Sequence, residues 1–112
     1  MNIKKLLFIC SQNKLRSPTA ENIFSEYQNF DVRSAGLNND AENVLSSEDI
    51  QWADYIFLME GTHKNKLLKK FKKYIKNQKI IVLNIPDIYD YMDQRLIKIL
   101  KEKVRKYLEF VE

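Results

Sequence analysis

Residues 8–18 read FICSQNKLRSP, and this stretch joins a short apolar run to the start of a helix. The apolar run from Ile3 to Ile9 predicts a buried strand. A helix from Ser17 to Tyr27 is predicted after the polar loop, because apolar side chains recur there at helical spacing and Pro18 is tolerated in a first helical turn. The chain therefore begins as strand, loop and helix.

The rest of the chain repeats this alternation of strands and helices. Strands are predicted for Phe30 to Ser34, Tyr55 to Met59 and Lys79 to Ile85, and helices for Ser46 or Ser47 to Ala53, Thr62 to Lys76 and Asp93 to Phe110. Such alternation is typical of parallel sheets with helices on both faces. We predict an α/β fold, a single three-layer domain over residues 1–112, whose four-stranded parallel sheet has the order 2-1-3-4.

Composition narrows the classes of protein that the chain can belong to. Its 112 residues are 45% hydrophobic and 30% charged, which fits one globular core and argues against disorder. No apolar run approaches the ~18 residues of a membrane span, and the opening residues lack the features of an export signal. The single cysteine cannot form an internal disulfide, so we expect a cytoplasmic protein in a reducing compartment.

The positive charge is concentrated in one segment. The formal net charge is +4, yet Lys64 to Lys79 carries lysines and no acidic residue. This segment could attract nucleic acid, an anionic surface or an acidic substrate, or it could be the solvated face of a helix. Lysines without arginine or stacking aromatic residues favour the solvated face, with nucleic-acid binding through Lys64 to Lys79 left open as an alternative.

The loop after the first strand carries the candidate chemistry. Cys10 ends the buried strand, and Arg16 follows six positions later at the start of the helix. A helix amino terminus binds phosphate through its unpaired N–H groups, and the same field favours a nucleophilic thiolate at Cys10. Arg16 is suited to hold two phosphoryl oxygens at once. Phosphate-binding residues are predicted from Ser11 to Ser17, namely Ser11, Gln12, Asn13, Lys14, Leu15, Arg16 and Ser17.

Other loops are predicted to meet this one at the carboxyl ends of the strands. They are the turn from Ser34 to Gly36, the segment after Met59 and the loop 86–92. Ser34 is expected to support the loop by hydrogen bonding. Asn13 tolerates positive φ and suits the bend that a loop without glycine must make. His63, the only histidine, is expected to be structural or solvated rather than catalytic.

FICSQNKLRSP resembles the active-site signature of the low-molecular-weight protein tyrosine phosphatases. The likeness extends to RSAG at residues 33–36, ADYIFLM at 53–59 and IPDIYDY at 85–91, and it is closest to a compact bacterial branch of that family. It implies a phosphatase without metal or cofactor that works through a phosphocysteine on a phosphorylated protein or peptide. It also implies that Asp87 is the general acid, with Cys10 and Arg16 as its catalytic partners.

Several assignments remain open at this point. Asp90 and Asp93 lie close to Asp87 in the sequence, and Tyr89 and Tyr91 are candidates for substrate contacts or for core packing. Gln12 and Leu15 stand where the family usually has a glycine and a second cysteine. The alternatives to a tyrosine phosphatase are a non-catalytic phosphate or nucleic-acid binding module and an enzyme like the arsenate reductases, which relay electrons through additional cysteines.

Overall fold

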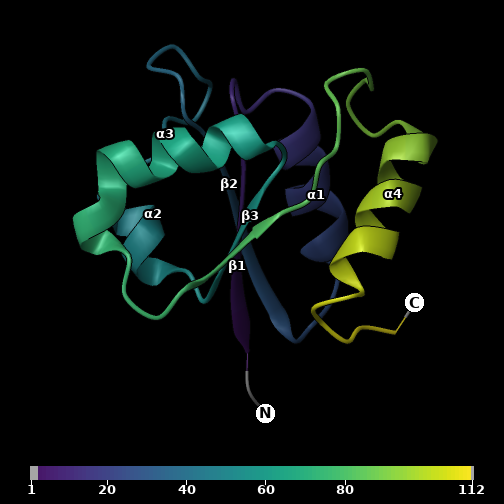
Figure 1. Cartoon of the computed structure of the whole chain (residues 1–112). Helices are drawn as coiled ribbons and strands as arrows, with labels where there is room; N and C mark the ends of the chain where they lie inside the picture. Colours follow the sequence, from purple (N-terminus) through teal and green to yellow (C-terminus); the bar gives the residue numbers. More distant parts are fainter. Residues whose placement is uncertain (1–2, 112) are drawn as a thin grey trace.

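The computed structural model describes residues 3–111 and contains one sheet of parallel strands. The strands are β1 (Lys4–Cys10), β2 (Phe30–Gly36), β3 (Tyr55–Leu58) and β4 (Lys79–Val82). Their order in the sheet is β2-β1-β3-β4, which confirms the predicted fold class and topology. All strands run in one direction, so the loops that follow them gather at one edge (Figure 1).

Helices cover both faces of the sheet (Figure 1). Helices α1 (Arg16–Phe24) and α4 (Gln94–Val104) pack on one face, and α2 (Ser47–Trp52) and α3 (Gly61–Phe71) pack on the other. A 3-10 turn at Lys72–Tyr74 continues α3. Side chains of β1 alternate between the two cores: Leu6 and Phe8 face α1 and α4, whereas Leu7 and Ile9 face α2.

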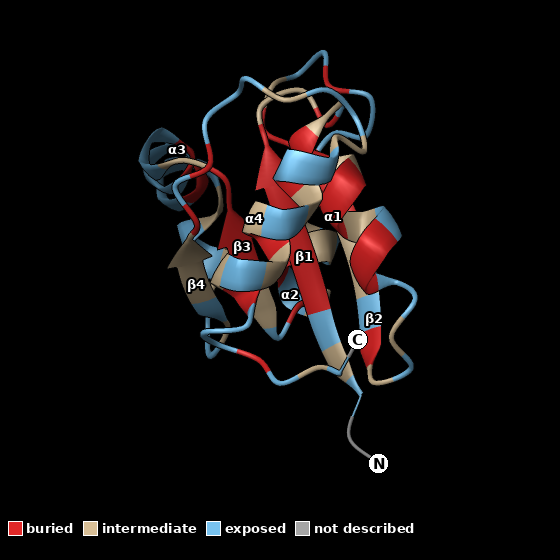
Figure 2. Cartoon of the chain, turned by 90° about the vertical axis from the view of Figure 1, so that its right-hand side faces the viewer, coloured by how far each residue is buried: buried red, intermediate tan, exposed pale blue. Residues whose placement is uncertain are grey.

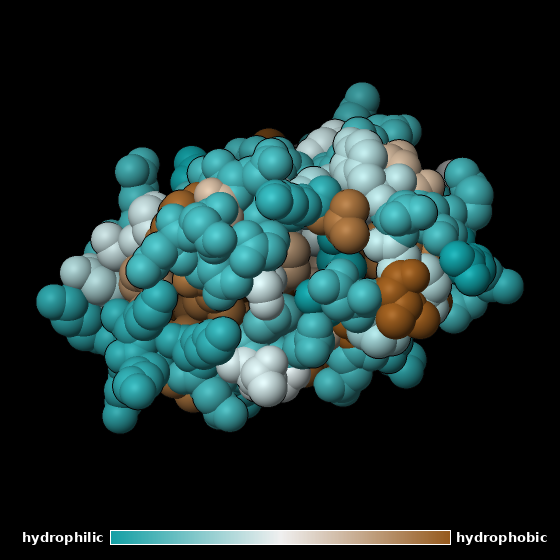
Figure 3. Space-filling view, turned by 90° about the horizontal axis from the view of Figure 1, so that it is seen from above, coloured by the Kyte–Doolittle hydropathy of each residue, from teal (hydrophilic) through white to brown (hydrophobic). Residues whose placement is uncertain are grey.

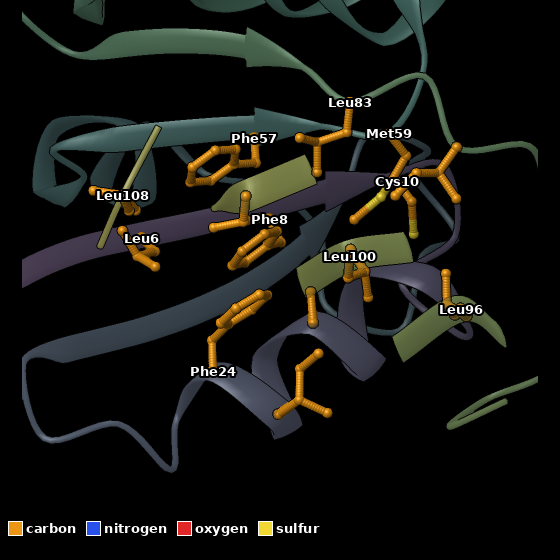
Figure 4. Packing of buried hydrophobic residues seen from close by; sticks show 14 of the residues in the cluster. Leu6, Phe8, Cys10, Phe24, Phe57, Met59, Leu83, Leu96, Leu100 and Leu108 are labelled. Atoms are coloured by element: carbon orange, nitrogen blue, oxygen red, sulfur yellow. The ribbon is translucent and has the colours of Figure 1, made fainter. Parts of the chain in front are cut away.

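The core beside α1 and α4 is rich in aromatic side chains. Phe8 stacks between Phe24, at a ring-centroid distance of 5.4 Å, and Phe57, at 5.0 Å. Cys10 lies at the end of the same row on β1 and is buried with it (Figure 4). The central strand is buried along most of its length (Figure 2), so the position of Cys10 is fixed by the packing of the strand that carries it.

Most element boundaries differ little from the predictions, and one helix is clearly shorter. The predicted helix from Asp93 to Phe110 ends at Val104, because the chain then turns to place Phe110 against the rings of Phe24, Tyr27 and Phe30. These edge-to-face contacts outweigh the continued helix. Across residues 3–111, no helix has the length and apolar character needed to cross a membrane.

The other helix predictions were wrong mainly at their ends. The lysine-rich helix ends at Phe71 rather than Lys76, and Lys72–Tyr74 forms the 3-10 turn. The start of α2 matches the prediction: Ser46 is the N-cap, accepting from the Asp49 backbone N–H, and the Asp49 carboxylate accepts from the Ser46 N–H.

Candidate active site

The loop from Cys10 to Arg16 is fastened from outside by the segment that follows β2. The carbonyl oxygens of Cys10, Ser11 and Gln12 accept hydrogen bonds from the backbone N–H groups of residues 37, 38 and 42 at 3.0 Å each. In a trans peptide the C=O and N–H point in opposite directions. The next N–H groups along the loop therefore point away from the fastening segment, toward the concave side of the loop.

Asn13 makes the bend of this loop. Its φ of 56° lies in the left-handed region, as the sequence predicts for a loop without glycine. Its backbone N–H donates to Cys10 Sγ at 3.2 Å. Gln12 is absent from the residues with positive φ within 3–111, so the loop needs no glycine at position 12 to take this shape. The substitution of glycine by Gln12 leaves the backbone path intact.

A chain of side-chain hydrogen bonds supports the cysteine from behind. The Asn13 Nδ2 amide donates to Ser17 Oγ at 2.9 Å and to Ser34 Oγ at 3.0 Å. Ser34 in turn donates to the Glu21 carboxylate. Because Ser17 Oγ accepts from Asn13, its own proton is available for Cys10 Sγ, which lies 2.9 Å away. Two donors thus converge on the sulfur and would stabilise negative charge there.

Gly36 lets the β2 turn approach the loop closely. A Cβ atom at this position would lie 2.5 Å from Ala41 Cβ, 2.7 Å from the Ser11 carbonyl oxygen and 3.0 Å from the Asn13 nitrogen. Those contacts are too short for any side chain. The requirement for glycine here is steric, since its φ is not positive.

Arg16 is buried, and its guanidinium is held in place mainly by hydrogen bonds from one nitrogen, Nη1. Its Nη1 donates to the Glu60 carboxylate at 2.5 Å and to the Ile85 carbonyl oxygen at 2.8 Å. Its Nε lies 3.6 Å from Asp87 Oδ1. Since Nη1 is occupied, Nε and Nη2 form the remaining edge of the fork. That edge presents two parallel donors, the arrangement that holds two oxygens of a phosphoryl group.

His63 links the start of α3 to the phosphate loop. It is buried, its Nδ1 accepts from the Glu60 N–H at 3.1 Å, and its Nε2 lies 3.0 Å from Ser11 Oγ. A ring nitrogen that accepts an N–H carries no proton, so in the neutral ring Nε2 donates to Ser11. Burial, followed by the charge of Arg16, lowers the pKa of His63 below its ordinary value of 6.5. His63 is thus buried rather than solvated, and its lack of a catalytic role stays a prediction.

The sequence-predicted residues meet around one small cleft. It has a volume of about 190 Å³ and is lined by Cys10, Ser11, Gln12, Lys14, Leu15, Arg16 and Asp87. Asn13 and Ser17 lie behind the cysteine rather than in the lining. The N-cap of α1 is Leu15, which offers no side-chain acceptor, so the first amides of the helix have no side-chain cap. This combination is suited to a bound anion.

The three aspartates of loop 86–92 and its vicinity differ in their surroundings. Asp87 lines the cleft with an exposed carboxylate. Asp93 instead caps α4 by accepting from the Arg95 N–H at 2.8 Å. Hydrogen bonds from Arg95 lower the pKa of Asp93 below its usual range, which agrees with its place as the cap of α4. Asp90 is not among the lining residues. The geometry therefore favours Asp87 as the acid.

The structure does not bring Tyr89 and Tyr91 into the lining of the cleft. Tyr89 packs against the core and has the Arg95 guanidinium 5.4 Å from its ring centroid, and the Tyr91 hydroxyl accepts from Asn22 at 3.1 Å. Their role in substrate binding stays a prediction. The sequence analysis named the segment after Met59 but not Glu60 itself, which lies two residues past the end of β3.

Comparison with known proteins agrees with this geometry. Residues 5–50, which include the loop, Ser34 and Gly36, match the sequence model of the family described as low molecular weight phosphotyrosine protein phosphatase. Over these residues, which make up less than half of the chain, the sequence is similar to that family. A search of curated protein sequences found no match.

Solved structures share the fold over nearly the whole chain. The YwlE arginine phosphatase from Geobacillus stearothermophilus is 20% identical, with a TM-score of 0.68 over 96% of this chain and 99% of that one. Wzb from Vibrio vulnificus, in complex with benzylphosphonate, is also 20% identical, with a TM-score of 0.74 over 95% and 97%. The low molecular weight protein tyrosine phosphatase from Streptococcus pyogenes is 17% identical, with a TM-score of 0.75 over 96% and 95%. These likenesses show the fold of the chain.

Proposed function

We propose that the protein hydrolyses phosphomonoesters through a phosphocysteine intermediate. The observation that carries this proposal is the placement of the Cys10 sulfur, the Arg16 guanidinium and the Asp87 carboxylate around one cleft whose wall is the phosphate loop. A nucleophile, an oxyanion-binding fork and a proton donor are the groups that such a reaction requires.

The first step transfers the phosphoryl group to the enzyme. Cys10 Sγ attacks phosphorus and forms an S–P bond while the P–O bond to the leaving group breaks. Protonated Asp87 gives its proton to the departing oxygen, so the alcohol leaves neutral. The loop amides and the free edge of Arg16 bind the equatorial oxygens as charge redistributes over them.

The second step releases phosphate and restores the enzyme. Asp87, now ionised, accepts a proton from a water molecule whose oxygen attacks phosphorus. The S–P bond breaks and the electron pair returns to sulfur, where the Asn13 N–H and the Ser17 hydroxyl stabilise it. Phosphate then leaves, with Asp87 protonated for the next cycle.

The substrate that we propose is a phosphorylated protein or peptide, with phosphotyrosine as the phosphorylated residue. The family description supports phosphotyrosine. Phosphoarginine is the second candidate, because one of the similar structures is an arginine phosphatase. It is a phosphoramidate, so with this substrate a P–N bond would break and Asp87 would give its proton to the departing guanidine nitrogen. Peptides that carry one or the other residue in the same sequence distinguish the two, and the larger kcat/KM identifies the substrate.

The deciding experiment measures turnover of an aryl phosphate by the wild type and by Cys10→Ser, without added metal. We expect turnover by the wild type, its loss in Cys10→Ser, and a phosphorylated cysteine in acid-quenched wild-type enzyme by mass spectrometry. Equal rates for the two proteins would overturn the proposal. Phosphate binding without turnover would support the non-catalytic binding module, and arsenate-dependent oxidation of an added thiol would support an arsenate reductase.

A further inference from the structure

The surface of α3 and the segment after it is positively charged without compensation. All eight lysines of this surface are exposed: Lys64, Lys66, Lys69, Lys70, Lys72, Lys73, Lys76 and Lys79. We call these side chains the lysine face. None of them takes part in the ion pairs found within residues 3–111. The molecule seen from above is largely hydrophilic on the side of α3 (Figure 3).

The spacing of these lysines opposes helix stability. Within α3, Lys66 lies three residues before Lys69 and four before Lys70, and like charges at these spacings repel one another. A helix face that serves only to be solvated usually mixes acidic and basic side chains, so that such pairs attract. The lysine face has no acidic residue between 61 and 80. An anionic partner would relieve the repulsion that the free protein bears.

The lysine face begins at the cleft. At the amino end of α3, Glu60 bonds to Arg16 and His63 bonds to Ser11. The helix therefore begins beside the phosphate loop. Further along, Lys70 Nζ donates to the Leu37 carbonyl oxygen at 3.3 Å, beside the segment that fastens the loop. At 1.5 Å per residue, α3 extends the positive surface by roughly 16 Å from the cleft. A chain whose phosphate occupies the cleft can thus lie along these lysines.

We propose that the lysine face binds an acidic polypeptide segment that flanks the phosphorylated residue of the substrate. The inference rests on the proposed phosphatase function and names the substrate class: phosphoproteins with a run of Asp, Glu or further phosphorylated residues next to the target. A polypeptide fits better than a nucleic acid for two reasons. The segment contains no arginine, and its aromatic rings, Phe71 and Tyr74, pack against the core instead of being available to stack on bases.

The test compares two phosphopeptides of one sequence, one with four Glu and one with four Gln beside the phosphorylated residue. The test variant is Lys69→Gln/Lys72→Gln/Lys76→Gln, which leaves the residues near the cleft unchanged. The matched control, Lys5→Gln/Lys98→Gln/Lys106→Gln, removes the same charge from exposed positions outside α3. Each protein is also assayed with a small aryl phosphate, which reports the chemistry alone.

We expect the wild type to prefer the acidic peptide by about tenfold, mainly through KM, and to lose the preference as salt is raised. The test variant, Lys69→Gln/Lys72→Gln/Lys76→Gln, should lose most of the preference, and the control variant should keep it. Aryl phosphate turnover should change less than about twofold in both, because neither set touches the cleft. An equal loss of preference in both variants, or no preference in the wild type, would overturn the inference.

Two further outcomes separate this inference from its alternatives. If wild-type turnover of the aryl phosphate is absent, the proposed function fails, whereas normal turnover without peptide preference defeats only the lysine-face proposal. A 5′-phosphorylated oligonucleotide of the same charge serves as a competitor. The oligonucleotide could inhibit the wild type more strongly than the acidic peptide does, and inhibit the lysine-face test variant less than the wild type. In that case the lysine face binds nucleic acid and the polypeptide assignment is wrong.

Discussion

Replacing Gly36 with alanine should damage the phosphate loop, although Gly36 itself does not line the cleft. The added Cβ would lie 2.5 Å from Ala41 Cβ and 2.7 Å from the Ser11 carbonyl oxygen, whereas ordinary contacts begin near 3.4 Å. The neighbours must move apart by somewhat under ~1 Å. Gly36 is itself fixed, because its N–H donates to the Asn43 carbonyl at 2.8 Å and its carbonyl accepts from Leu45 at 2.9 Å. The displacement therefore falls on the loop.

The expected effect is large on activity and moderate on stability. Misplacement of catalytic groups by about 1 Å costs on the order of 100-fold in rate, and overpacking costs about 1–3 kcal/mol of unfolding free energy. Turnover of an aryl phosphate and thermal unfolding measure the two effects. The matched control is Gly61→Ala: a Cβ there meets nothing within 4 Å, and the residue opens α3. Gly61→Ala should keep its activity and be as stable as the wild type or slightly more so.

The reasoning fails if Gly36→Ala keeps its activity within about threefold and unfolds at the wild-type temperature, since overpacking of this size should lower the midpoint by several degrees. Equal losses in the two glycine variants would also contradict it. That result would trace the damage to glycine replacement in general. A loss confined to Gly36→Ala, with phosphate affinity reduced in parallel, supports a loop held in place by close backbone contact.

Three further predictions concern side chains of the site. Arg16→Lys keeps the charge but loses the fork, so aryl phosphate turnover should fall by about 100-fold or more, and retention within a few-fold would make Arg16 a bystander. Asp87→Asn should slow phosphotyrosine hydrolysis far more than hydrolysis of an ester with an acidic phenol, and the same dependence in Asp90→Asn instead would move the acid to Asp90. Because the pKa of His63 is lowered, the folded state binds fewer protons than the unfolded state, and stability present above pH 6.5 should be lost as pH falls below that value. NMR titration of this sole imidazole should give a midpoint below 6.5 and a proton on Nε2 at neutral pH, and a midpoint at or above 6.5 would contradict the buried network.

Local pattern was sufficient for the parts of the fold in which neighbouring residues decide the structure. Short apolar runs predicted the strands, the right-handed connection of strands through helices predicted their order, and Ser46 with Asp49 predicted the start of α2. The ends of the helices were harder to predict from the sequence. The end of α4 depends on where the ring of Phe110 finds partners, and those partners, such as Phe24, are far away in the sequence. No local signal in the carboxyl-terminal residues contains that information.

The candidate site divides in the same way. Cys10, Arg16 and the bend at Asn13 lie in one continuous loop, so their spacing alone predicted their meeting. Glu60 and the Ile85 carbonyl reach Arg16 from the segments that follow β3 and β4, two strands that are adjacent only in the folded sheet. Predicting these contacts requires the register of β3 against β1 and β4, which the sequence pattern does not specify.

The fastening of the Cys10, Ser11 and Gln12 carbonyl oxygens by the segment after β2 has an evolutionary consequence. Because main-chain groups shape the anion cradle, the side chains at positions 12, 14 and 15 can diverge without loss of the cradle. Gln12 is an example, because its backbone has no positive φ and so does not require a glycine. Main-chain groups then recognise the phosphoryl group, whereas side chains at the rim discriminate among the molecules that carry it. Selection can reshape the rim of the cleft for a new substrate while the reaction beneath it stays the same.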